Sequence, residues 1–137
     1  MNIFEIKDKI KVTWNPEVRA IIDTWSTYFI TIEEFKEAVM VAGMNHAKAN
    51  NGQAWIVDSS KAEGVFMQAI QKFIGETVFP TFVKNGIKYF ITINSKVQAV
   101  TRLTVNQYKA TAVISGLEQI ELNSVEDAIL WLKSHSS

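Results

Sequence analysis

The sequence predicts an α/β domain in which an N-terminal β-hairpin is followed by alternating strands and helices. Apolar and polar residues alternate near the N-terminus, short apolar runs typical of buried strands recur at 54–58 and 88–94, and helically spaced apolar residues fill the segments between them. Strands that alternate with helices require right-handed crossovers and parallel pairing. We therefore expect a mixed, mostly parallel sheet of about five strands with about four helices.

The hairpin is predicted from two extended runs separated by a turn. Ile10, Val12 and Trp14 alternate with polar residues, and the Asn-Pro-Glu sequence at 15–17 has the composition of a turn. Residues 18–25 then resume an extended run rich in β-branched side chains. These two runs should pair as antiparallel strands.

The first helix is predicted to start at a capping box. Thr31 precedes Glu34 by three residues, so the hydroxyl and the carboxylate can each accept from the other residue's backbone N–H. Apolar residues follow at helical spacing, and the Asn-Asn-Gly sequence at 50–52 favours an end to the helix.

A strand at 54–58 and two helical segments follow. Residues 64–74 and 77–86 both have helical apolar spacing, with Pro80 in the first turn of the second segment. We expect these two segments to be separate helices or one bent unit.

The last third of the chain repeats the alternation. The buried strand at 88–94 is followed by an expected helix at 97–108 and an alternating strand at 117–122. Ser124 is the expected N-cap of a final helix, and residues 134–137 are expected to fray.

Bulk composition restricts the class of protein. A length of 137 residues suits one domain, 1–137. Fourteen basic and fourteen acidic residues leave no net charge, so nucleic-acid binding has no general electrostatic basis. The chain has no cysteine, no apolar core of a signal peptide in its first residues, and no apolar run approaching the roughly 20 residues that span a bilayer. These features favour a cytoplasmic protein with no membrane span.

Taken together, the segments resemble the SpoIIAA-like, STAS-type domains, and in particular the small stand-alone branch described as STAS-like or SEC14/STAS proteins. The matching pieces cover nearly the whole chain: the hairpin ending in Trp25, then TIEEF, AWIVD, TVFPTFVKNGIKYFITIN and SVEDAILWLKS. The resemblance implies a SpoIIAA-like fold and a non-enzymatic regulatory or protein-interaction module. Its STAS side implies a protein partner, and its SEC14 side a lipid-like or other apolar ligand.

The resemblance also draws attention to the polar residues after the strand at 54–58. In anti-anti-sigma factors a serine directly after an aspartate, at a helix N-terminus, is phosphorylated by a partner kinase, and the matching residues here are Asp58, Ser59 and Ser60. In those regulators glycine follows the serine at once, whereas here three residues intervene before Gly64. The alternative is that these side chains only satisfy turn and cap donors.

Aromatic residues are numerous, and most are expected in the core: Trp25, Tyr28, Phe29, Phe66, Phe73, Phe79 and Phe82. The stretch 66–82 nevertheless contains more apolar side chains than one buried helix face needs. Phe66, Phe73, Phe79 and Phe82 are therefore candidates for a partner surface, a homodimer interface or the lining of an apolar-ligand pocket.

Catalytic signals are weak. The sequence has no phosphate-binding glycine loop, no paired-histidine metal motif and no nucleophile elbow. His46 is the one histidine in the body of the chain, and a catalytic base needs an orienting partner that the sequence does not identify. We expect no enzymatic activity, no cofactor and no metal.

Overall fold

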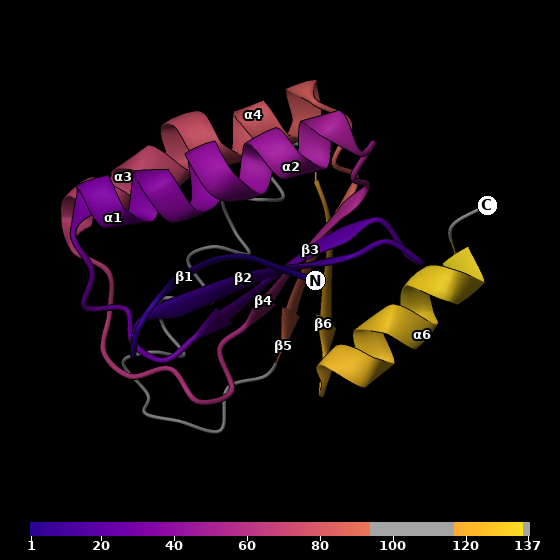
Figure 1. The fold of residues 1–137 in the computed structure, drawn as a ribbon, viewed down its shortest axis with the longest axis horizontal. Helices are drawn as coiled ribbons and strands as arrows, with labels where there is room; N and C mark the ends of the chain where they lie inside the picture. Colours follow the sequence, from indigo (N-terminus) through magenta and orange to yellow (C-terminus); the bar gives the residue numbers. More distant parts are fainter. Residues whose placement is uncertain (94–116, 136–137) are drawn as a thin grey trace.

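The fold is seen in a computed structural model, which describes residues 1–93 and 117–135. Six strands form one sheet in the order β1-β2-β3-β4-β5-β6 (Figure 1). β1 to β3 pair antiparallel and β3 to β6 pair parallel, which confirms the α/β class and the mixed sheet. The strands are β1 (Asn2–Ile6), β2 (Ile10–Asn15), β3 (Ala20–Trp25), β4 (Ala54–Asp58), β5 (Tyr89–Ile93) and β6 (Glu118–Leu122).

The predicted hairpin is β2–β3, and the sixth strand, β1, was not expected. The pairing of β1 with β2 shifts register between Asn2 and Phe4, which is the signature of a bulge. Ile3 and Phe4 are consequently both half-buried against the core, so the alternation of period two that identifies a strand is broken.

The first helix covers residues 32–49 and starts where the capping box predicted. It consists of α1 (Ile32–Phe35), a π-helical segment (Lys36–Gly43) and α2 (Met44–Ala49). The Glu34 N–H donates to Thr31 Oγ1 at 3.1 Å, and the Thr31 N–H donates to Glu34 Oε1 at 3.0 Å. Lys9 also donates to both carboxylate oxygens of Glu34, at 2.9 and 3.0 Å, and so joins the hairpin to the helix.

The second helix is continuous over residues 68–84. It consists of α3 (Gln68–Phe73), a π-helical segment (Ile74–Val78) and α4 (Phe79–Lys84), so the two expected segments form one unit. The wider π turn directly precedes Pro80, whose ring would clash with the previous turn of a regular α-helix. The helix starts later than expected because Gly64 has a φ of 78° and Met67 is extended.

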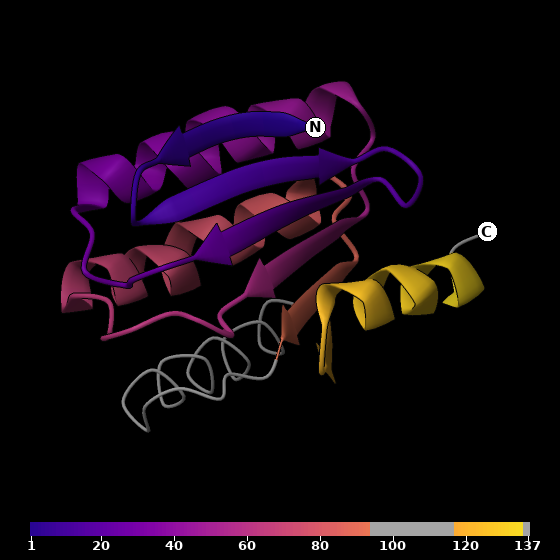
Figure 2. The ribbon, with the colours of Figure 1, turned by 60° about the horizontal axis from the view of Figure 1, so that its bottom comes forward.

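The molecule has three layers, with the sheet in the middle. The first and second helices lie side by side on one face, and α6 (Val125–His135) covers the other (Figures 1 and 2). Ser124 caps α6 by accepting from the Asp127 N–H at 3.1 Å. The helix continues through His135, whose ring stacks on Trp131, so Ser134 and His135 are helical rather than frayed.

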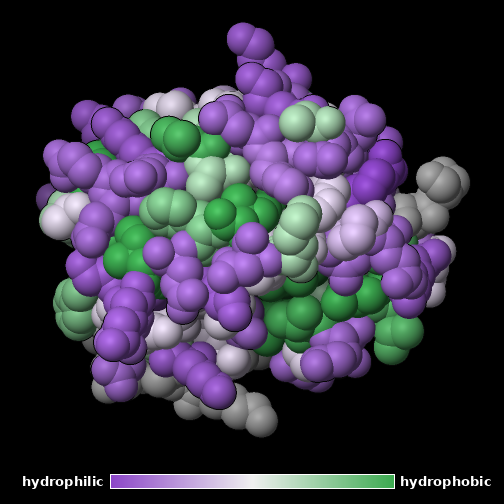
Figure 3. Space-filling model, viewed as in Figure 1, coloured by the Kyte–Doolittle hydropathy of each residue, from purple (hydrophilic) through white to green (hydrophobic). Residues whose placement is uncertain are grey.

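The expected helix at 97–108 and the last two residues of the expected tail lie outside the described residues. Within the described ranges, no helix combines the length and the apolar character needed to cross a membrane. Figure 3 shows the face that carries β1 and α6, on which hydrophilic side chains interrupt the apolar surface.

Candidate functional site

Ser59, the first residue after β4, is buried against the loop that follows β3. Its hydroxyl is hydrogen-bonded to the hydroxyl of Tyr28, and both side chains are almost completely shielded from solvent. Burial is the main cause of a raised pKa for Tyr28, so its hydroxyl stays protonated at neutral pH. The two hydroxyls therefore satisfy each other inside the protein.

Asp58 and Ser60 form a local turn at the same junction. Asp58 Oδ1 accepts from the Ser60 N–H at 3.1 Å and from the Ser60 hydroxyl at 2.7 Å. These two residues also line a shallow hollow of about 220 Å³ beside the N-terminus of α6, which Glu126 lines as well. A phosphate on Ser60 would meet two carboxylates there, and like charges disfavour it.

The phosphorylation hypothesis stays a prediction, but the geometry sets its requirements. The Ser59 hydroxyl is inaccessible unless the junction opens, and α3 starts only at Gln68, so no helix N-terminus follows the serine directly. The arrangement of Asp58 and Ser60 matches the alternative, in which short polar side chains satisfy turn donors.

Phe66, Phe79 and Phe82 lie in the core, each with only 1% of its surface exposed. Phe73 is half-buried between the two helices, with its ring against Phe35 and the Lys36 ammonium 4.9 Å from the ring centroid. The apolar excess of this stretch is thus used inside the chain. In this structure the four phenylalanines present no continuous surface to a partner.

Among the aromatic residues at 1–93 and 117–135, the exposed one is instead Phe29, in the loop between β3 and α1. It is 67% exposed, and Met67, before α3, is 50% exposed. Both side chains line an open hollow of about 270 Å³, together with Lys9, Tyr28, Ile30, Thr31 and Val65. We call Phe29, Val65, Met67 and this hollow the carboxyl-edge patch, because the loops that form it follow the carboxyl ends of β3 and β4.

The backbone holds the carboxyl-edge patch in place. Thr27 and Glu63 form a parallel β-bridge between the two loops, and the Tyr28 N–H donates to the Glu63 carbonyl at 2.8 Å. The Phe29 ring lies over Gly64, where a Cβ atom would come within 2.4 Å of it. Glycine at 64 thus permits both the positive φ and the position of the ring.

Asp23 is a carboxyl group in the middle of β3, and it points into the core beneath the helices. Its side chain is 2% exposed, and its Oδ2 accepts from the indole N–H of Trp55 at 2.8 Å. Its Oδ1 is buried and has no hydrogen-bond partner. Loss of hydration raises the pKa of Asp23 to about 7, although the Trp55 hydrogen bond acts in the opposite direction.

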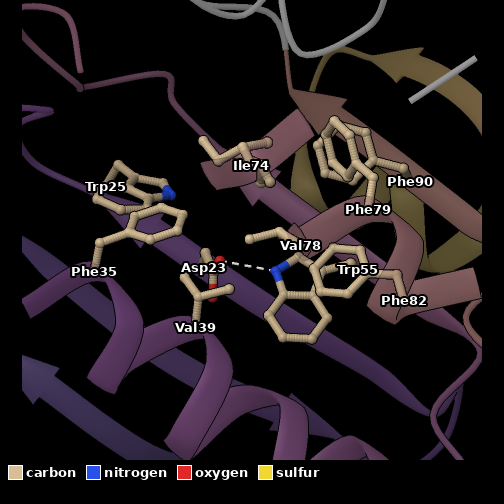
Figure 4. A pocket seen from close by; sticks show the side chains of 11 residues that line it. Asp23, Trp25, Phe35, Val39, Trp55, Ile74, Val78, Phe79, Phe82 and Phe90 are labelled. Carbon is tan, nitrogen blue, oxygen red and sulfur yellow. Dashed lines mark hydrogen bonds between the residues drawn. The ribbon is translucent and has the colours of Figure 1, made fainter. Parts of the chain in front are cut away.

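A small cavity of about 30 Å³ lies beside this carboxyl group. Figure 4 shows Asp23 bonded to Trp55, with Trp25 and Phe35 on one side and Phe79, Phe82 and Phe90 on the other. The cavity is lined by Asp23, Trp25, Phe35, Val39, Trp55, Val57, Ile74, Val78, Phe79, Phe82 and Phe90. Two of the four candidate phenylalanines, Phe79 and Phe82, are therefore in the lining, while Phe66 and Phe73 are outside it.

His46 lies in α2 with its ring edge against Trp14, at a centroid distance of 5.0 Å. Its Nε2 is buried and has no hydrogen-bond partner. The described part of the chain places no carboxylate or hydroxyl on this ring, and it contains no group of three acidic or histidine residues that could hold a metal ion. The geometry thus assigns His46 a packing role against the hairpin.

Two features of these sites were not recognised in the sequence. Asp23 interrupts an apolar strand on the same face as Ile21 and Trp25, and an acidic residue at such a position is a signal of a buried polar site. Phe29 has no such signal, because its exposure depends on the bridge between two loops.

The chain matches no family model, and searches of curated proteins and of solved structures find no similar protein.

Proposed function

We propose that this chain is a cytoplasmic, non-enzymatic protein-interaction module of the SpoIIAA-like type, and that it binds its partner at the carboxyl-edge patch. The observation that carries the proposal is the exposure of Phe29 and Met67 beside a hollow. Exposed apolar side chains that gather at one place are typical of an interaction site, whereas isolated ones are ordinary.

The position of the patch in the sheet supports the same conclusion. Binding residues are disproportionately found on loops that a rigid scaffold positions, such as those at the carboxyl ends of parallel strands. The Thr27–Glu63 bridge connects the two loops before any partner binds, so little conformational entropy is lost on binding. A large apolar side chain of the partner fits the hollow next to Phe29.

Photo-crosslinking in the native cell tests the proposal. Phe29 is replaced by a photoreactive phenylalanine analogue, and the control carries the same analogue at Val41, which is 56% exposed on the outer side of the first helix. We expect a discrete crosslinked protein from position 29 and none from position 41. The purified captured protein should then bind the unmodified chain in solution.

The result also identifies the kind of partner. A crosslink to a second copy of the chain makes the module a homodimer, and a crosslink to another protein makes it a hetero-interaction module. Equal crosslinking at positions 29 and 41, or a captured protein that does not bind the purified chain, contradicts the proposal.

A second candidate function is a small-ligand carrier, which the cavity beside Asp23 favours. The volume of about 30 Å³ suits a group the size of one water molecule, and a lipid-like chain enters only if the two helices separate. Phe79 and Phe82 line this cavity, in keeping with the apolar-ligand pocket considered from the sequence. The ligand would be much smaller than a lipid.

A further inference from the structure

The cavity beside Asp23 combines a buried acceptor with aromatic walls. Asp23 Oδ1 lacks a hydrogen-bond partner, although buried carboxyl oxygens almost always have one. Six of the eleven lining residues are aromatic: Trp25, Phe35, Trp55, Phe79, Phe82 and Phe90. The unpaired oxygen and the cavity at the same place indicate a site for a hydrogen-bond donor.

A single water molecule would fill this cavity of about 30 Å³, but it would leave the charge of the buried carboxylate uncompensated. Buried waters normally make two to four hydrogen bonds, about three on average. Among the lining side chains Asp23, Trp25 and Trp55 carry polar atoms, and the Trp55 N–H already donates to Asp23 Oδ2. A water would therefore find the Asp23 carboxyl group as its side-chain acceptor and the Trp25 N–H as its remaining side-chain donor, but no lining side chain is cationic.

An ammonium group is similar in size to water and supplies the positive charge that the lining lacks. It donates to a carboxylate, it neutralises the buried charge, and it is attracted by the π faces of aromatic rings. We propose that the cavity binds the ammonium group of a small primary alkylamine, with Asp23 as its ion-pair partner and the aromatic residues as its walls. The inference rests on the second candidate function and is independent of the carboxyl-edge patch.

The helices above the cavity provide a route for the alkyl part of the amine. Val39 comes from the π-helical segment of the first helix, and Ile74 and Val78 come from that of the second helix. π-helical turns are rare and frequently occur at functional sites. Both helices thus have their irregular turns at the cavity, and the alkyl chain lies between them when they separate.

The indole N–H of Trp55 reports directly on binding, because it donates to the same carboxyl group. The test titrates ¹⁵N-labelled protein at pH 8 with n-butylamine and compares n-butanol and sodium chloride. We expect a saturable shift of the Trp55 indole signal with the amine alone, at about 1–10 mM for so small a ligand. The Trp131 signal should stay constant, because that residue packs on the opposite face of the sheet.

Two variants identify the site. Asp23→Asn keeps an acceptor for Trp55 and removes the charge, so the amine-dependent shift should disappear. Val78→Ile adds one methylene group at the cavity and leaves Asp23 in place, and it should weaken amine binding at least ten-fold. The second variant keeps the test decisive if Asp23→Asn does not fold.

Three outcomes overturn the inference: no saturable shift up to about 100 mM amine, an equal response to sodium chloride, or amine binding that survives in Asp23→Asn and Val78→Ile. If n-butanol binds as well as the amine, and binds Asp23→Asn too, the small-ligand carrier stands and ammonium recognition fails. If neither n-butanol nor n-butylamine binds, both the small-ligand carrier and ammonium recognition fail.

Discussion

At the scale of single residues, the carboxyl group of Asp23 is the strongest electrostatic feature of the core. Its pKa is raised because burial removes the hydration that stabilises the charged form. In the unfolded chain the group titrates near 3.8, and in the folded chain near 7. Between these values the folded state binds more protons than the unfolded state, so the free energy of unfolding decreases as the pH rises.

This difference predicts a pH-dependent effect of Asp23→Asn. At pH 4 the two proteins should have similar free energies of unfolding, because both side chains are neutral in the folded state. Above pH 7 the variant should be the more stable, by at most about 4 kcal/mol, which corresponds to the difference between about 7 and 3.8. Urea unfolding at several pH values measures the difference in free energy of unfolding between the two proteins. A difference that does not change with pH contradicts a raised pKa for Asp23.

The buried pair of Tyr28 and Ser59 predicts a non-additive result. Tyr28→Phe leaves the Ser59 hydroxyl without this partner in an apolar environment, which should lower the free energy of unfolding by about 1–3 kcal/mol. The double variant Tyr28→Phe/Ser59→Ala removes both hydroxyls and should be more stable than Tyr28→Phe alone. Denaturant unfolding of the full double-mutant cycle tests the pair, and strict additivity would exclude the coupling.

At the scale of elements, the start of the first helix depends on two separable interactions. Thr31→Ala removes the cap and should lower the free energy of unfolding by about 1 kcal/mol. Glu34→Gln keeps an acceptor for the Thr31 N–H and loses only the charge that pairs with Lys9, so its effect should be smaller, about 0.2–1 kcal/mol. Thermal unfolding of both variants gives the order, and a larger effect of Glu34→Gln would contradict this description.

Gly64 and Gly86 form a matched pair for the carboxyl-edge patch. Both have a positive φ, of 78° and 91°, but an added Cβ meets the Phe29 ring only at Gly64. Gly86→Ala should therefore show the backbone cost alone, about 1–2 kcal/mol. Gly64→Ala should show a similar cost and also displace the Phe29 ring, which changes in the ring's NMR signals will reveal. Unchanged Phe29 signals would show that the ring does not lie over Gly64.

Regular elements could be predicted from the sequence where local chemistry and burial agree. The capping box at Thr31 and the alternation in β2 are local signals, and both are confirmed. β1 was missed because its bulge breaks the alternation. The sequence does not decide between two helices and one bent unit at 64–86, because Pro80 usually marks a helix start. The π turn that accommodates this proline depends on packing between helices, which a local pattern does not contain.

The candidate sites were less predictable, because they depend on contacts between distant segments. Ser59 was recognised as a polar junction residue, but its burial follows from a partner thirty-one positions away, Tyr28. Phe29 is exposed because Thr27 pairs with Glu63 across two loops. Asp23 could have been found, since it replaces an apolar residue on the core-facing side of a strand.

At the scale of the whole molecule, the sheet separates two regions with different properties. The cavity beside Asp23 lies under the two helices and is lined by buried side chains, while the carboxyl-edge patch lies at the loops and includes the exposed Phe29 and Met67. α6 closes the opposite face and is tied to the β2–β3 turn by an ion pair between Lys133 and Glu17. The open patch is thus the part of the described surface that best fits a protein partner.

The affinity of the crosslinked partner for three forms of the chain tests the proposed interaction most directly. The forms are the unmodified chain, Phe29→Ser and Val41→Ser, each checked for an unchanged unfolding temperature. We predict that Phe29→Ser raises the dissociation constant at least ten-fold, about 1.4 kcal/mol, and that Val41→Ser leaves it unchanged. Equal dissociation constants for Phe29→Ser and the unmodified chain would contradict binding at the carboxyl-edge patch.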